Sequence, residues 1–194
     1  MIFETNKFNE YWNALDKVFF LEKNFPEDVF KIPFSHYGFI EFDESMTSRF
    51  WDEIRTWSSE KTKEIIMAVI DPDPVGYYYR VFQRYNMIVL PKEAQYSQYS
   101  EALDEEPPNS PADSIFTNST VIGWIPDSLE WAIWGDRGHE FCVIGSNSKI
   151  QIKYTDLDLM EIEDALNIMQ AYHRKLDSSF FETFRANYGE PRKN

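Results

Sequence analysis

The chain has 194 residues, of which 43% are hydrophobic and 17% aromatic. That is enough for one domain with a substantial core, and it argues against intrinsic disorder. The formal net charge is −14, which disfavours binding to nucleic acids and to anionic membranes because their phosphate groups would repel the chain. The same charge permits a basic protein partner.

Cysteine content and targeting segments bear on the compartment. Cys142 is the only cysteine, so no intrachain disulfide can form, and the apolar run around it predicts a buried, inert thiol. Residues 1–10 lack the basic end and apolar run of a secretory signal. No apolar run is long enough to cross a membrane. We therefore expect a cytoplasmic protein without membrane association.

The first half of the chain alternates between helical and strand patterns. Apolar residues recur at helical spacing within residues 6–22 and again within residues 45–58, which predicts two amphipathic helices. Alternation predicts a strand over residues 36–42. The continuous apolar run at 64–70 predicts a central strand that is covered on both faces.

The segment after this central strand has two interpretations. The aromatic residues at 77–85 fit a short helix or an aromatic strand, and the helix is preferred. A short strand follows at 87–90 and is closed by a proline. A helix between the two strands would allow them to lie parallel to each other.

Residues 100–114 are acidic and rich in proline, which predicts a long surface loop. One or two helical turns at 94–103 are compatible with the sequence. The pieces on either side of the loop are too short to build separate cores. The sequence therefore predicts a single domain over residues 1–194.

Three apolar runs between residues 120 and 145 are separated by tight turns and predict a three-stranded meander. In the middle strand, Trp131 and Ile133 would share one face and Trp134 would lie on the other. The alternative is a short helix over 129–134, but the segment is short for a helix and the turn that follows suits a hairpin.

The last third of the chain predicts one more strand and two helices. Alternation over 149–154 indicates an edge strand, which would extend the meander to about residue 154. Residues 155–176 show a strong helical pattern with acids first and bases last, as the helix dipole favours. A shorter helix is predicted at 178–187. The whole pattern predicts an α+β domain, with a mixed and mainly antiparallel sheet covered by N-terminal and C-terminal helices.

Catalytic signatures are weak in this sequence. We find no glycine-rich phosphate loop, no nucleophile elbow and no histidine pair at metal-ligand spacing, so neither a cofactor nor a metal is predicted. The best catalytic candidates are Asp71 and Asp73, because loops after strand ends often build sites and paired carboxylates can act as acid and base or hold a cation. A proline turn with solvated aspartates explains the same residues and is preferred.

Two groups of residues are candidates for contacting a protein. The first is a charged hairpin tip beside an indole, although a local ion pair would explain the same charges; its members are Trp134, Asp136, Arg137 and Glu140. The second is a run of tyrosines that cannot all enter one core, so that some would form a contact surface beside the acidic loop; its members are Tyr77, Tyr78 and Tyr79.

Two functional hypotheses follow. The preferred one is a protein-interaction module, such as an inhibitor or immunity-type protein, that masks a basic protein partner. It depends on acidity, surplus aromatic residues and missing catalytic motifs, although acidity alone is common among proteins without charged partners. The alternative is a small enzyme or small-molecule binder with Asp71 and Asp73 near an aromatic pocket.

Overall fold

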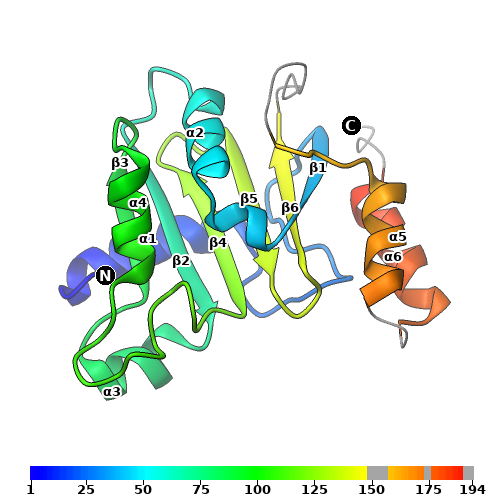
Figure 1. Cartoon of the computed structure of the whole chain (residues 1–194). Helices are drawn as coiled ribbons and strands as arrows, with labels where there is room; N and C mark the ends of the chain where they lie inside the picture. The colour runs from blue at the N-terminus through cyan, green and yellow to red at the C-terminus, as the bar shows by residue number, and fades with distance from the viewer. Residues whose placement is uncertain (148–156, 173–175, 190–194) are drawn as a thin grey trace.

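A six-stranded sheet in the order β1-β6-β5-β4-β2-β3 organises the protein (Figure 1). The computed structural model describes residues 1–147, 157–172 and 176–189. The strands are β1 (His36–Glu41), β2 (Glu64–Asp71), β3 (Met87–Pro91), β4 (Val121–Pro126), β5 (Trp131–Asp136) and β6 (Phe141–Ser146). All pairs of neighbouring strands in this sheet are antiparallel. The predicted α+β class is confirmed. The prediction also allowed some parallel pairing in the sheet, but every pair of neighbouring strands in it is antiparallel.

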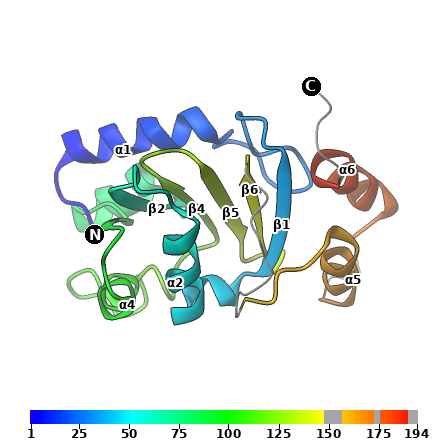
Figure 2. The same ribbon diagram turned by 90° about the horizontal axis from the view of Figure 1, so that it is seen from above.

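Helices flank the sheet. They are α1 (Thr5–Val18), α2 (Ser48–Trp57), α3 (Arg80–Phe82), α4 (Tyr96–Asp104), α5 (Ile162–Tyr172) and α6 (Ser178–Tyr188), with shorter helical turns η1 (Asp43–Met46) and η2 (Pro74–Tyr79). Helix α1 lies on one side of the sheet and α2 and α4 lie on the other, whereas α5 and α6 lie beside β1 (Figure 2). The sheet is thereby shielded from solvent on both faces.

The meander of β4, β5 and β6 follows the predicted alternation. Trp131 and Ile133 belong to the apolar cluster that faces α2 and α4, and Trp134 belongs to the cluster that faces α1. A strand that begins at Trp131, rather than a helix over 129–134, occupies this segment, as preferred, because the hairpin allows each face to enter a separate cluster. The strand predicted at 149–154 lies outside the described residues.

The predicted parallel arrangement of β2 and β3 is wrong. Helix η2 and its continuation α3 lie beyond the end of the sheet and do not cross its face (Figure 1). The chain therefore returns beside β2 in the opposite direction, because a parallel return would require the connection to cross a face of the sheet. The preference for a helix after β2 is correct. Strand β2 is an interior strand paired with β3 and β4, one position from the edge.

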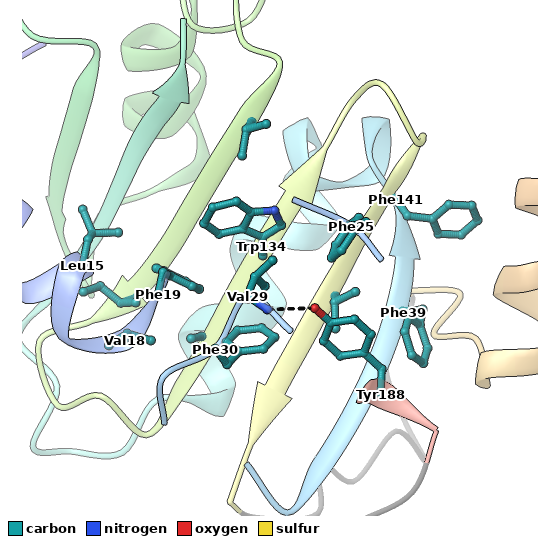
Figure 3. Packing of buried hydrophobic residues seen from close by; sticks show 14 of the residues in the cluster. Leu15, Val18, Phe19, Phe25, Val29, Phe30, Phe39, Trp134, Phe141 and Tyr188 are labelled. Carbon is teal, nitrogen blue, oxygen red and sulfur yellow. Dashed lines mark hydrogen bonds between the residues drawn. The ribbon is translucent and has the colours of Figure 1, made fainter. Parts of the chain in front are cut away.

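The cluster facing α1 ties distant parts of the chain together. The ring of Trp134 packs against Phe19, with 5.3 Å between ring centroids. Main-chain N–H of Val29 donates a 3.0 Å hydrogen bond to the hydroxyl of Tyr188 (Figure 3). This bond fixes α6 against the segment that follows α1.

Two helix boundaries differ from their predictions. Helix α1 ends at Val18 and not near residue 22, because Phe19 forms an antiparallel bridge with Phe30. The predicted continuous helix over 155–176 is wrong, because α5 begins at Ile162. Before it, the N–H of Met160 donates to the carbonyl of Phe39 at 2.8 Å. Main-chain pairing with another segment of the chain overrides the local helical pattern in both places.

The loop in the acidic, proline-rich segment begins and ends later in the chain than predicted. Helix α4 extends to Asp104, so the loop before β4 covers residues 105–120. It is not wholly a surface loop, because Ile115 is fully buried in the cluster that faces α2 and α4. The buried side chain of Ile115 thus anchors this connection to the core.

Candidate functional site

Most of the residues singled out from the sequence lie at one end of the sheet. Asp71 ends β2 and pairs with Val121, which in turn pairs with Asp136 at the end of β5. With neighbouring strands about 4.8 Å apart, the backbones at Asp71 and Asp136 lie roughly 10 Å apart. We define the strand-end surface as residues 71–82, 105–120 and 136–140.

The two candidate catalytic aspartates have different environments. The carboxylate of Asp73 accepts hydrogen bonds from the N–H of Val75, at 2.9 Å, and from the N–H of Gly76, and so caps helix η2. Asp71 is exposed, and its main-chain carbonyl accepts from the N–H of Thr120 at 2.7 Å. Asp73 therefore has a structural role, and the pair is not enclosed as an acid–base pair would be.

The three consecutive tyrosines have three environments. Tyr77 is 38% exposed, and its hydroxyl donates to a carboxylate oxygen of Asp113 at 2.9 Å. Tyr78 is fully buried, and burial raises the pKa of its hydroxyl well above the usual value. Tyr79 is half-buried, and its ring stacks on Tyr85 with 4.5 Å between centroids. Of the three, only Tyr77 presents a large part of its side chain to a partner.

Asp113 organises the loop before β4. Its carboxylate accepts hydrogen bonds from the hydroxyls of Tyr77 and Ser110 and from the amide of Asn118, the last at 2.5 Å. Burial acts to raise the pKa of Asp113, but these three donors together outweigh it and hold the pKa below its usual range. No local pattern marks this residue, because Tyr77 lies 36 residues away in the sequence.

Arg137 at the hairpin tip is used internally. Its guanidinium donates to the main-chain carbonyls of Ser119 at 2.8 Å and Phe116 at 2.9 Å, and lies 4.7 Å from the ring centroid of Phe42. It therefore fastens the loop before β4 to the β5–β6 hairpin. These internal contacts explain the position of Arg137 without an ion pair to a partner protein.

The other hairpin residues are also largely structural. Asp136 is buried and lies 2.7 Å from the Nδ1 atom of His139. Glu140 is half-buried, with a left-handed backbone (φ 65°) whose carbonyl accepts from the N–H of Phe42. Trp134 is fully buried, which corrects its place among the candidates for binding, because a partner cannot reach its indole directly.

The surface also presents apolar side chains that the sequence patterns did not single out. On η2 and α3, Val75 is 53% exposed and Val81 is 58% exposed. On the loop before β4, Phe116 is 47% exposed. No signal in the sequence indicated the exposure of Val81, because it fits the same helical spacing as Tyr78 and Phe82.

Neither a metal cluster nor a membrane helix is found among the residues that the structure describes. Within residues 1–147, 157–172 and 176–189, no three His, Cys, Asp or Glu side chains are grouped so that they could hold a metal ion. Across these same ranges, no helix combines the length and apolar character needed to cross a bilayer.

Comparison with protein-family models, curated proteins and solved structures finds no match for this chain.

Proposed function

We propose that this chain is a cytoplasmic protein-interaction module that binds a basic protein partner through the strand-end surface. One observation carries the proposal. Apolar side chains stay exposed on two segments that the Tyr77–Asp113 hydrogen bond holds together. These exposed side chains are Val75, Tyr77, Val81 and Phe116.

Apolar side chains gathered at one end of a folded domain commonly mark a protein contact. Here the supporting segments are already ordered by internal bonds, among them the Asp73 cap of η2 and the Arg137 bonds to the loop. A partner would therefore lose little free energy to ordering of the surface on binding. An aromatic and aliphatic centre of this kind supplies the anchors from which most binding energy comes.

Charge favours a basic partner. The whole chain has a net charge of −14, and the exposed carboxylates of Asp71 and Glu106 belong to the strand-end surface. Arg80 is an exposed cation in the same region, whereas Arg137 is bonded to the loop. Masking the basic surface of another protein, as an inhibitor or immunity-type protein does, is the form of interaction that fits this balance.

A capture experiment tests the proposal. The purified chain, immobilised and exposed to extract of its native host, is expected to retain a basic protein that sodium chloride releases, because screening weakens charge pairing. The double variant Val81→Ala with Phe116→Ala is expected to lose about tenfold in retention through loss of the apolar anchors. Tyr172→Ala is the matched control, because Tyr172 on α5 is 62% exposed but lies outside the strand-end surface.

Equal retention by the double variant and the control would contradict the proposal. So would an acidic captured protein, or a complex that salt does not weaken. The enzyme alternative has less support, because the Asp73 carboxylate is engaged as a helix cap and Asp71 is open to solvent.

A further inference from the structure

Helix η2 combines main-chain hydrogen bonds of two helical kinds. The carbonyl of Asp73 accepts from the N–H of Tyr77, four residues on, and from the N–H of Tyr78, five residues on, both at 3.1 Å. The first spacing is that of an α-helix and the second that of a π-helix. Further along, the N–H of Arg80 donates to the carbonyl of Val75, which is again the π spacing. We call this arrangement the π register, and the α register is the one in which the four-residue spacing continues.

The two registers differ by one residue, because a π-helical turn holds one residue more than an α-helical turn. With Asp73 kept as the cap, a change to the α register moves every residue after Gly76 forward by one position. Tyr77 then takes the position of Tyr78, and Tyr78 takes the position of Tyr79. The run of three tyrosines makes this shift an exchange of like for like.

The end of α3 has room for the displaced residue. Helix α3 stops at Phe82, and Gln83 after it has a left-handed backbone (φ 55°). Gln83 and Arg84 form a bend before Tyr85, which is paired with Ile2. A shift that begins in η2 therefore ends in this bend and leaves β3 in place.

The two inner tyrosine positions select a ring and not a hydroxyl group. Tyr78 is fully buried, yet its hydroxyl has no hydrogen-bond partner among the residues that the structure describes. Its ring packs against Phe82, with 5.3 Å between centroids. The ring of Tyr79 stacks on Tyr85, with 4.5 Å between centroids. Neither ring contact distinguishes one tyrosine from the next.

The hydrogen bond from Tyr77 to Asp113 does distinguish the registers. In the α register Gly76, which has no side chain, replaces Tyr77 opposite Asp113, and the 2.9 Å bond is lost. The same shift moves Val81, now 58% exposed, to the half-buried position of Phe82. The α register thus removes both Tyr77 and Val81 from the strand-end surface.

We propose that η2 exchanges between these two registers, and that the Tyr77–Asp113 hydrogen bond holds the π register, in which the strand-end surface is complete. A partner that binds this surface selects the π register, because binding shifts an equilibrium toward the state that the partner contacts. That consequence rests on the proposed function, whereas the register exchange itself needs no partner.

NMR relaxation dispersion of the isotope-labelled full chain tests the proposal. Register shifts of helices take microseconds to milliseconds, which is the range that this method detects. We expect exchange broadening of the main-chain amides of residues 77–82. Tyr77→Phe keeps the ring and removes the hydrogen bond, so the population of the α register, and with it the broadening, should rise about fivefold. Tyr79→Phe is the matched control, because the position of Tyr79 is held by its ring.

Tyr77→Ala separates a register shift from local loosening. Alanine also lacks the hydroxyl group, but in the α register it would leave the buried position of Tyr78 unfilled, and a cavity of that size is costly. We therefore expect broadening below the wild-type level in Tyr77→Ala, whereas local loosening would raise it. Tyr77 is 38% exposed in the π register, so both substitutions leave the core intact.

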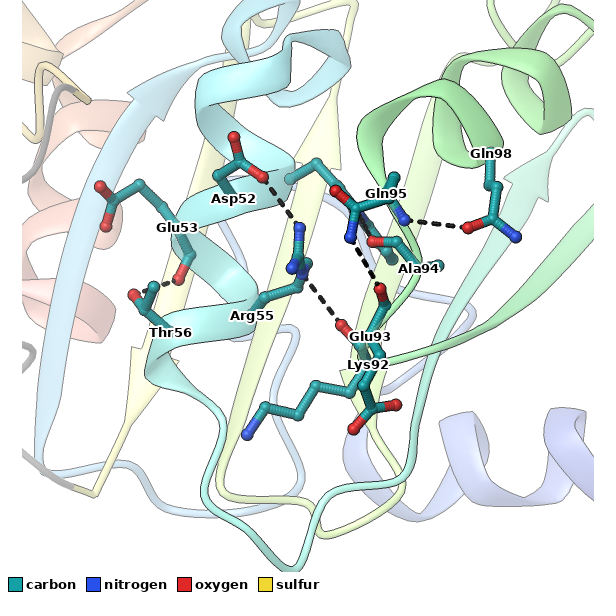
Figure 4. A network of polar contacts seen from close by, with 10 residues as sticks. Asp52, Glu53, Arg55, Thr56, Lys92, Glu93, Ala94, Gln95 and Gln98 are labelled. Atoms are coloured by element: carbon teal, nitrogen blue, oxygen red, sulfur yellow. Dashed lines mark hydrogen bonds and ion pairs between the residues drawn. The ribbon is translucent and has the colours of Figure 1, made fainter.

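Helix α4 provides the internal reference for these spectra. The side chain of Gln98 accepts from the N–H of Gln95 at 2.9 Å and closes its first turn (Figure 4). Just before it, the guanidinium of Arg55 donates to the carbonyl of Lys92 at 2.9 Å. The amides of α4 are therefore expected to relax equally in the wild type and all three variants.

Three results would overturn the proposal. These are no rise in broadening with Tyr77→Phe, an equal rise with Tyr79→Phe, or a rise with Tyr77→Ala. No partner is present in these measurements. A failed capture experiment therefore counts against the strand-end surface alone, and a failed dispersion experiment counts against the register exchange alone.

Discussion

The hydroxyl of Tyr77 donates a 2.9 Å hydrogen bond to a carboxylate oxygen of Asp113, joining the helix after β2 to the loop before β4. Asp113 accepts from Ser110 and Asn118 as well, so one carboxylate sets the path of that loop. The exposed side chain of Phe116 depends on this path for its position. The bond therefore connects stability of the fold with the surface proposed to bind a partner.

Replacement of Asp113 by alanine should destabilise the protein by about 1–3 kcal/mol, because three partly buried donors lose their shared acceptor. Unfolding by urea at pH 7 measures the change. Glu106→Gln is the matched control, since Glu106 is an exposed acid on the same loop. If both variants unfold at the same urea concentration, Asp113 does not organise the loop.

The same carboxylate makes a prediction about pH. Its pKa is lower in the folded protein than in the unfolded chain, so its stabilisation is present above about pH 4, the unfolded value, and is lost as pH falls through the folded pKa. The difference in unfolding free energy between the wild type and Asp113→Asn should therefore shrink on acidification below about pH 4. A difference that stays constant down to the acid limit would contradict the assigned cause.

Asp73→Ala should destabilise the protein by about 0.5–2 kcal/mol, because η2 loses its N-terminal cap. Asp71→Ala, two residues earlier, should change stability by less than about 0.5 kcal/mol, since its side chain is exposed. Thermal unfolding of the two variants provides the comparison. Equal losses of stability in the two variants would contradict the capping role given to Asp73.

Gly145→Ala should destabilise the protein by about 1–3 kcal/mol through overpacking. An added Cβ at Gly145 would collide with a ring carbon of the buried Phe34. At Gly38, on the neighbouring strand β1, the nearest atom would be a methyl carbon of Leu159 at 3.6 Å, an ordinary contact. Gly38→Ala is thus the matched control, and no loss is expected from it in urea unfolding. Tolerance of alanine at Gly145 would show that Phe34 can move aside.

Tyr188→Phe should cost about 1–3 kcal/mol, because the N–H of Val29 would lose its acceptor in a buried place. The carbonyl of Glu27, which accepts from the same hydroxyl at 2.5 Å, would lose its donor. Tyr172→Phe controls for removal of a hydroxyl at an exposed position. Melting temperatures of the two variants that coincide would contradict the role given to Tyr188 in holding α6.

Local patterns in the sequence predicted the elements well. Alternation in β5 assigned Trp131 and Ile133 to one face and Trp134 to the other, and both assignments are confirmed. The pattern at 178–187 predicted α6 to within a residue. These features are set by the spacing of neighbouring side chains, which differs between strands and helices.

The candidate site was predicted less well. Asp73 and Arg137 have the residue types of a functional site, yet one caps a helix and the other fastens a loop. Asp113 was not predicted as the organising carboxylate, and Phe116 was not predicted as an exposed anchor. A charged side chain looks the same in sequence whether it meets solvent, a partner or the protein's own main chain.

By itself, the sequence determined the periodicity of most elements, the α+β class and the acidic, aromatic character of the chain. Only the tertiary structure decided the strand order, the antiparallel return of β3, the start of α5 and the place of Asp113 beside Tyr77. The physical reason is the range of the interactions. Periodicity depends on adjacent residues, whereas strand pairing and buried hydrogen bonds depend on which distant segments meet when the core closes.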